Sequence, residues 1–144
     1  MKIVILCAAA LALQCGMAEA QTSKTNPLAS SQVFLYEQMT VKTALNGAEG
    51  RNVFNGTLAT GESVGLHETM QPVGTVPNPA HKIEHSELIV VQEGTLEFQH
   101  DGKAERVGPG GIIYVALGTM HAIKNVGGVP AKYVVIQIGG DTKK

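Results

Sequence analysis

The feature that most constrains the fold is a succession of short apolar segments, separated by glycine- and proline-containing turns, between residues 62 and 138. Val and Ile are frequent in these segments, and in 63–70 apolar and polar residues alternate, which is typical of a strand with two different faces. The segments are 63–70, 87–92, 95–99, 103–107, 112–116, 120–124 and 131–138. Strands at spacings of about 8–12 residues, with no helical pattern between them, predict an all-β sandwich or a closed barrel.

The connections give further expectations. Asp101-Gly102 predicts a tight hairpin, because both residues tolerate positive φ, and places His100 at the hairpin tip. Residues 71–79 contain three prolines and end the strand before them. Residues 33–36 predict a short edge strand, whereas 41–56, rich in Asn and Gly, predict a loop.

Residues 1–20 have the organisation of a secretory signal peptide. Lys2 supplies a positive charge, residues 3–13 form an apolar stretch too short to cross a bilayer as a helix, and Ala18-Glu19-Ala20 fits a small-x-small cleavage site. We therefore expect a secreted or periplasmic protein whose mature chain begins near Gln21. A retained hydrophobic anchor and a lipid-modified Cys15 are the alternatives.

The amino-acid composition limits the classes of partner that we expect. Lys and Arg number 11 against 12 Asp and Glu, so the chain shows no electrostatic footprint for nucleic acid or for a membrane surface. Both cysteines, Cys7 and Cys15, lie within the expected signal peptide. After cleavage the protein has no thiol for disulfides, metal ligation or nucleophilic catalysis. The expected partner is a small molecule.

Two groups of ligand-type residues and glycines stand about forty residues apart. The first contains His81, Glu87 and Gly94, and the second contains Gly110, Gly118, His121 and Asn125. Their spacings resemble the two sequence motifs of the cupin superfamily, although Gly74 is one residue off, Ala116 replaces a proline and Ile83 replaces a histidine. The resemblance implies a single double-stranded β-helix (jelly-roll) barrel over 57–140, with 21–56 as leader and arm, in a homodimer in which 33–36 joins the neighbouring sheet.

By the same resemblance, His81, Glu87 and His121 are three of the usual four metal ligands, for Mn, Fe(II), Ni or Zn. His81, His85 and Glu87 have the same parity, and about six residues of straight strand span ~20 Å, so one ion requires a bend between positions 83 and 87. His85 is either an exposed turn residue or a neighbour of the site. His67 lines the barrel if its strand face points inward and is otherwise a surface residue.

Two classes of function follow. The first is a metal-dependent enzyme of the dioxygenase, lyase or isomerase type, acting on a small polar molecule through a two-His-one-Glu site. The second is a non-catalytic cupin that binds a small molecule and has lost the metal, since isoleucine cannot coordinate. The imidazoles and the carboxylate also suit acid–base chemistry without an ion.

Overall fold

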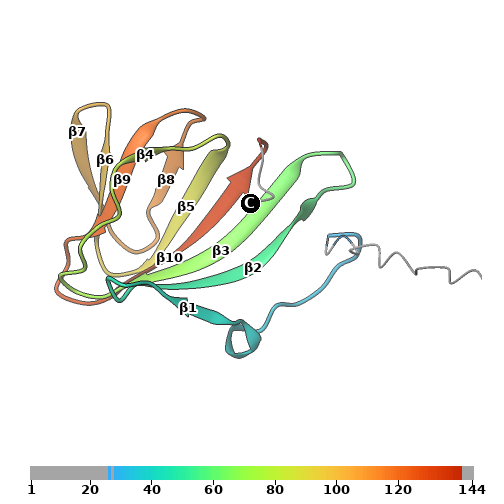
Figure 1. The fold of residues 1–144 in the computed structure, drawn as a ribbon, viewed down its shortest axis with the longest axis horizontal. Helices are drawn as coiled ribbons and strands as arrows, with labels where there is room; N and C mark the ends of the chain where they lie inside the picture. The colour runs from blue at the N-terminus through green and yellow to red at the C-terminus, as the bar shows by residue number, and fades with distance from the viewer. Residues whose placement is uncertain (1–25, 27, 141–144) are drawn as a thin grey trace, which may run out of the picture.

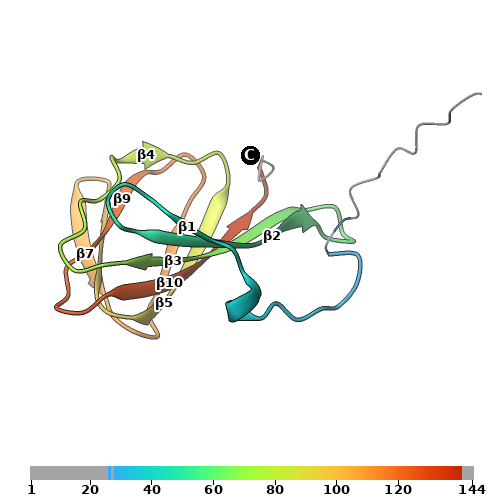
Figure 2. The ribbon, with the colours of Figure 1, turned by 60° about the horizontal axis from the view of Figure 1, so that its bottom comes forward.

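The computed structural model describes residues 26 and 28–140; the expected signal peptide 1–20 lies outside them. The chain forms two antiparallel sheets that curve around a common interior (Figures 1 and 2). The six-stranded sheet has the order β1-β2-β3-β10-β5-β8, and the four-stranded sheet has the order β4-β9-β6-β7. The expected all-β jelly-roll architecture is confirmed.

Most of the strands fall where the sequence places them. The six-stranded sheet contains β1 (Val41–Thr43), β2 (Glu49–Thr57), β3 (Ser63–Gln71), β10 (Ala131–Ile138), β5 (Ser86–Glu93) and β8 (Ile112–Val115). The four-stranded sheet contains β4 (His81–Lys82), β9 (Met120–Asn125), β6 (Leu96–His100) and β7 (Lys103–Val107). At the β6–β7 turn Asp101 and Gly102 have φ values of 47° and 74°, which confirms the predicted hairpin.

The prediction that residues 41–56 form a loop is wrong. Residues 41–43 and 49–57 are β1 and β2, and β2 pairs with β3 from Glu49↔Met70 to Thr57↔Ser63. The backbone pairing with β3 outweighs the weak strand propensity of the Asn and Gly residues. The leader and arm expected over 21–56 therefore include two strands of the barrel sheet.

The prediction that residues 33–36 form an edge strand is also wrong. This stretch is irregular and runs into a 3₁₀ turn, η1 (Tyr36–Gln38). Phe34 packs against Phe54 of β2 with ring centroids 5.3 Å apart, and the Arg51 guanidinium lies 4.4 Å from the centre of the Tyr36 ring. Residues 33–38 are therefore held by side-chain contacts rather than by strand pairing.

The core lies between the two sheets. Ile89, Val91, Leu96 and Val115 are almost fully buried, and they pack with other inward-facing aliphatic and aromatic side chains of both sheets. The inward positions turn polar elsewhere in the barrel, where His67, Glu87 and Gln137 replace aliphatic residues. Among the described residues, no helix is long and apolar enough to cross a membrane.

Candidate functional site

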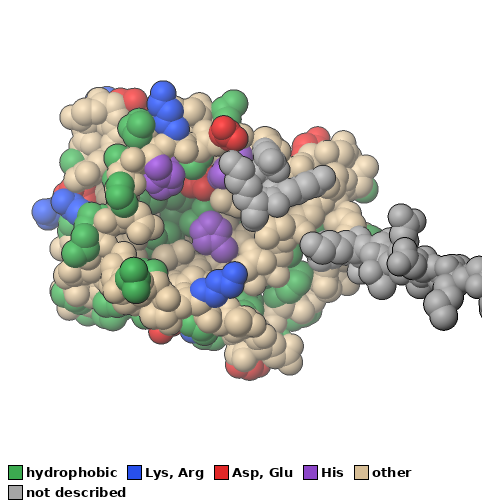
Figure 3. Space-filling model, in the orientation of Figure 1, with side chains coloured by type: hydrophobic (Ala, Val, Ile, Leu, Met, Phe, Trp, Pro, Cys, Tyr) green, Lys and Arg blue, Asp and Glu red, His purple; other side chains and the backbone are tan. Residues whose placement is uncertain are grey.

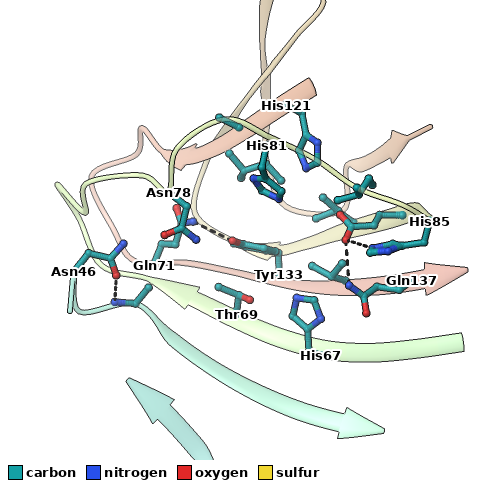
Figure 4. A pocket seen from close by; sticks show the side chains of 17 residues that line it. Asn46, His67, Thr69, Gln71, Asn78, His81, His85, His121, Tyr133 and Gln137 are labelled. Atoms are coloured by element: carbon teal, nitrogen blue, oxygen red, sulfur yellow. Dashed lines mark hydrogen bonds and ion pairs between the residues drawn. The ribbon is translucent and has the colours of Figure 1, made fainter. Parts of the chain in front are cut away.

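A cavity of about 390 Å³ opens into the barrel between the two sheets. Four of the five histidines of the chain line it, and Figure 3 shows histidine side chains at a hollow in the surface. Figure 4 shows their rings directed into the cavity from different strands. The lining consists of Asn46, Ala48, His67, Thr69, Gln71, Asn78, His81, Ile83, His85, Glu87, Ile89, His121, Ala122, Ile123, Tyr133, Val135 and Gln137.

His81 and His121 form a pair on neighbouring strands. They are direct register partners between β4 and β9, and their ring centroids lie 4.7 Å apart. The Nδ1 atom of His81 is 3.2 Å from the carbonyl oxygen of Pro79, and that of His121 is 3.1 Å from the carbonyl oxygen of Thr119. Because a carbonyl oxygen only accepts, each Nδ1 donates its proton, and in the uncharged form of each ring Nε2 then carries a lone pair for another partner.

Glu87 belongs to a different set of contacts. The His85 Nε2 donates to Oε1 of Glu87 at 2.8 Å, and the Gln137 side-chain amide donates to the same oxygen at 3.3 Å. The glutamate is buried, with 7% of its surface exposed. Figure 4 shows the partners of Glu87, His85 and Gln137, on the same side of the cavity as each other.

The expected bend before Glu87 is present. β4 ends at Lys82 in the four-stranded sheet, β5 begins at Ser86 in the six-stranded sheet, and the chain bends at 84–85. The backbone N–H of Gly118 donates to the carbonyl oxygen of Ile83 at 3.0 Å and holds the bend against the β8–β9 connection. The bend brings His81, His85 and Glu87 to one cavity although all three have the same parity.

The residues present do not, as arranged, make a three-ligand metal site. Within 26 and 28–140, no three His, Cys, Asp or Glu side chains converge in a way that could hold an ion. Two imidazoles meet, but the Glu87 oxygen Oε1 is engaged by His85 and Gln137. Ile83, at the position of the missing ligand, is buried in the core and lines the cavity. The assignment of His81, Glu87 and His121 as metal ligands stays a prediction.

The same sheet also carries neutral polar groups, on β3 and β10. The Gln71 side-chain amide donates to the Tyr133 hydroxyl at 3.0 Å, and the backbone N–H of Asn125 donates to the Gln71 side-chain oxygen at 2.9 Å. Burial raises the pKa of Tyr133 to about 12, so the phenol stays protonated at neutral pH. Burial also lowers the pKa of His67, which favours its uncharged ring.

The structure places the remaining histidines clearly. His67 faces inward from β3, and His85 lies in the cavity rather than on an exposed turn. His100 is at the β6–β7 hairpin, where its ring contacts Glu105 at 2.7 Å and Asp101 at 3.1 Å. Sequence reasoning missed Gln71, Tyr133 and Gln137; their available signal was parity, because they face inward in register with His67 and Glu87.

The two antiparallel sheets and the cavity between them define a double-stranded β-helix of the jelly-roll type. The family model for the cupin domain matches residues 66–137, half of the chain, and the chain therefore belongs to the cupin family.

Solved structures of the same fold are numerous and distant in sequence. An RmlC-like cupin from Shewanella frigidimarina aligns with a TM-score of 0.64 at 16% identity, covering 78% of this chain and 95% of the other. KdgF from a Halomonas species gives 0.65 at 16% identity, covering 78% and 97%. The polyketide cyclase RemF from Streptomyces resistomycificus gives 0.60 at 17% identity, covering 80% and 88%. The comparison with curated proteins finds no match. At these identities the structural likeness establishes the fold alone.

Proposed function

We propose that this protein is a small-molecule-binding cupin whose ligand site is the barrel cavity. The observation that carries the proposal is the convergence of four histidines and one buried glutamate on a cavity of about 390 Å³. Cavities of about 300–1,000 Å³ with a few converging polar groups are typical of small-molecule sites. The polar groups are supplied by strands of both sheets, so the fold itself holds them in place.

The lining suits a polar ligand. His81 and His121 offer Nε2 acceptors, Glu87 offers a carboxylate, and Gln71 with Tyr133 offers neutral amide and hydroxyl groups. Ile89, Ile123 and Val135 supply apolar walls between them. A ligand that leaves these buried polar groups without partners loses binding free energy, so the site favours molecules with several hydrogen-bonding groups. Imidazole and carboxylate groups are also the usual acids and bases of enzymes, which makes proton transfer on a bound ligand the natural chemistry of this site.

Histidine NMR tests the proposal. The mature chain without an affinity tag is screened with a library of small polar fragments while the ring signals of all five histidines are followed. We expect fragments that shift the signals of His67, His81, His85 and His121 together. His100, outside the cavity at the hairpin, is the internal control. If no fragment moves the four cavity signals selectively while the protein stays folded, the proposal fails.

A divalent metal is the second candidate, favoured by one observation. Both His81 and His121 direct Nδ1 to a backbone carbonyl and leave Nε2 open, which is how metal-binding histidines are commonly held. As a third ligand, Glu87 would have to exchange its contact with His85 for the ion. Chelator-treated protein is titrated with Mn, Fe(II), Ni and Zn, because an ion that binds the folded state raises the Tm. A rise in Tm that His121→Ala abolishes supports this candidate, and an unchanged Tm for all four ions removes it.

Export belongs to the same proposal. The signal-like organisation of residues 1–20 supports cleavage before Gln21 and a secreted or periplasmic protein. Mass spectrometry of the protein recovered after expression of the full chain tests this. A recovered chain that still begins at Met1 contradicts it.

A further inference from the structure

Few of the side chains that line the cavity carry a formal charge. Among its seventeen lining residues there is one carboxylate, that of Glu87, and there is no Lys or Arg. Figure 3 shows one basic side chain beside the hollow and others toward the edges of this face, and no Lys or Arg is among the lining residues. A bound anion would therefore meet no fixed positive charge inside the cavity, and it would lie near a buried negative one.

Two hydrogen-bonding positions of the cavity are acceptors when the imidazoles are uncharged. These are the Nε2 atoms of His81 and His121, whose Nδ1 atoms donate to backbone carbonyls. The contacts of the Glu87 carboxylate with His85, at 2.8 Å, and with Gln137, at 3.3 Å, are both made by Oε1. In the described part of the chain no hydrogen bond reaches Oε2 of Glu87.

A buried carboxylate oxygen without a donor costs free energy, and a ligand that brings N–H groups removes that cost. A positively charged donor does more, since charge-assisted hydrogen bonds are stronger than neutral ones and no Lys or Arg lines the cavity. An ammonium or amidinium group carries several N–H groups, which suits a cavity lined by both a carboxylate and imidazole rings.

Building on the proposed function, we infer that the cavity selects small organic cations that donate N–H bonds, ammonium or amidinium groups, and rejects carboxylates and phosphates. The cationic group lies against Glu87 and the His81–His121 pair. The uncharged remainder of the ligand lies toward Gln71 and Tyr133, whose amide and hydroxyl groups carry no charge at neutral pH.

Three probes of one shape test the charge preference. Benzamidine, benzamide and benzoate share a planar skeleton and carry a positive, a neutral and a negative group. Their Kd values for the wild-type mature protein are measured from the histidine ring signals. We expect benzamidine to bind about tenfold or more tightly than benzamide, and benzoate to show no binding. This ranking needs no variant, so it does not depend on how a mutant folds.

Two substitutions on β5 test whether Glu87 causes the preference for the cationic probe. Glu87→Gln should bring benzamidine within about twofold of benzamide, because the charge is removed while the amide keeps an acceptor. Glu93→Gln removes the same charge from the exposed end of the same strand and should leave the ranking unchanged. Equal or tighter binding of benzoate overturns the inference and leaves the proposed function standing. Binding of none of the three probes also overturns it, and the fragment screen then decides whether the cavity binds small molecules at all.

Discussion

Single residues explain why the ends of several strands hold together. Asn125, at the end of β9, is buried, and its side-chain amide donates to the carbonyl oxygens of Gln71 at 3.0 Å and Val129 at 2.8 Å. Its side-chain oxygen accepts the backbone N–H of Gly127 at 2.9 Å. One side chain thus ties β9 to the end of β3 and closes the turn that leads into β10.

Asn125→Ala should therefore destabilise the protein by about 3 kcal/mol, because it leaves several buried backbone groups without a partner. Urea unfolding followed by circular dichroism measures the change. Asn52→Ala is the matched control: its side chain bonds Asn55 at an exposed position, and about 0.5 kcal/mol or less is expected. Similar losses for both variants would contradict the role of Asn125.

The histidines should titrate in a definite order. Burial lowers the pKa of His67, whereas the carboxylates of Glu105 and Asp101 raise the pKa of His100. We expect the His67 ring to gain its proton below the ordinary midpoint near pH ~6.5 and the His100 ring to gain it above. NMR titration of the five ring signals reads both midpoints. The reverse order would show that His67 does not face the barrel interior.

For single residues, the sequence predicted which side chains line the cavity better than it predicted which side chains contact one another. Motif spacing located His81, Glu87 and His121, and all three line one cavity. The sequence left two places open for His85, an exposed turn or the neighbourhood of the site, because the bend at 84–85 determines where its ring lies and parity along a straight strand does not apply there.

At the scale of elements, two glycines with the same backbone conformation have different surroundings. Gly94, between β5 and β6, has φ of 74°, and a Cβ there would lie 2.7 Å from the Cα of Ala131 and 2.8 Å from the Pro130 oxygen. Gly102, in the β6–β7 hairpin, also has φ of 74°, but a Cβ there would meet nothing within 4 Å. The first turn is constrained by packing as well as by backbone conformation.

Gly102→Ala should cost about 1–2 kcal/mol, the penalty for a left-handed backbone with a side chain. Gly94→Ala adds a contact with backbone that has little room to move, and about 2–4 kcal/mol is expected in total. Thermal and urea unfolding of the two variants side by side measure the difference. Equal losses would mean that the β10 backbone shifts to make room.

The elements also show where sequence patterns mislead. The Asp101-Gly102 hairpin was predictable, because its turn type depends only on those two residues. β2 was not, since Asn52, Asn55 and Gly56 have low strand propensity and are held by pairing with β3.

At the scale of the molecule, the outer face of the six-stranded sheet is apolar across five strands. Register pairs place Tyr114, Leu88, Ile136, Leu66 and Phe54 in one row, and opposed residues lie on the same face. The next row contains Ile112, Val90 and Val134. Strands that are apolar on both faces are typical of sheets covered on both sides. The arm packs against this face at Phe54 through Phe34.

We expect a second copy of the chain to cover the rest of this face, because an apolar patch is complementary to itself across a two-fold axis. Ile112 and Tyr114, 65% and 62% exposed on the edge strand β8, are positions where the fold should tolerate charge. We expect the wild-type chain to sediment as a dimer and the double variant Ile112→Lys, Tyr114→Lys to sediment as a folded monomer. Val76→Lys, at a 71% exposed position in the 72–80 connection, is the control and should remain dimeric. A wild-type protein that is monomeric at every concentration would show that the two apolar rows remain open to solvent, and the expected homodimer would then be wrong.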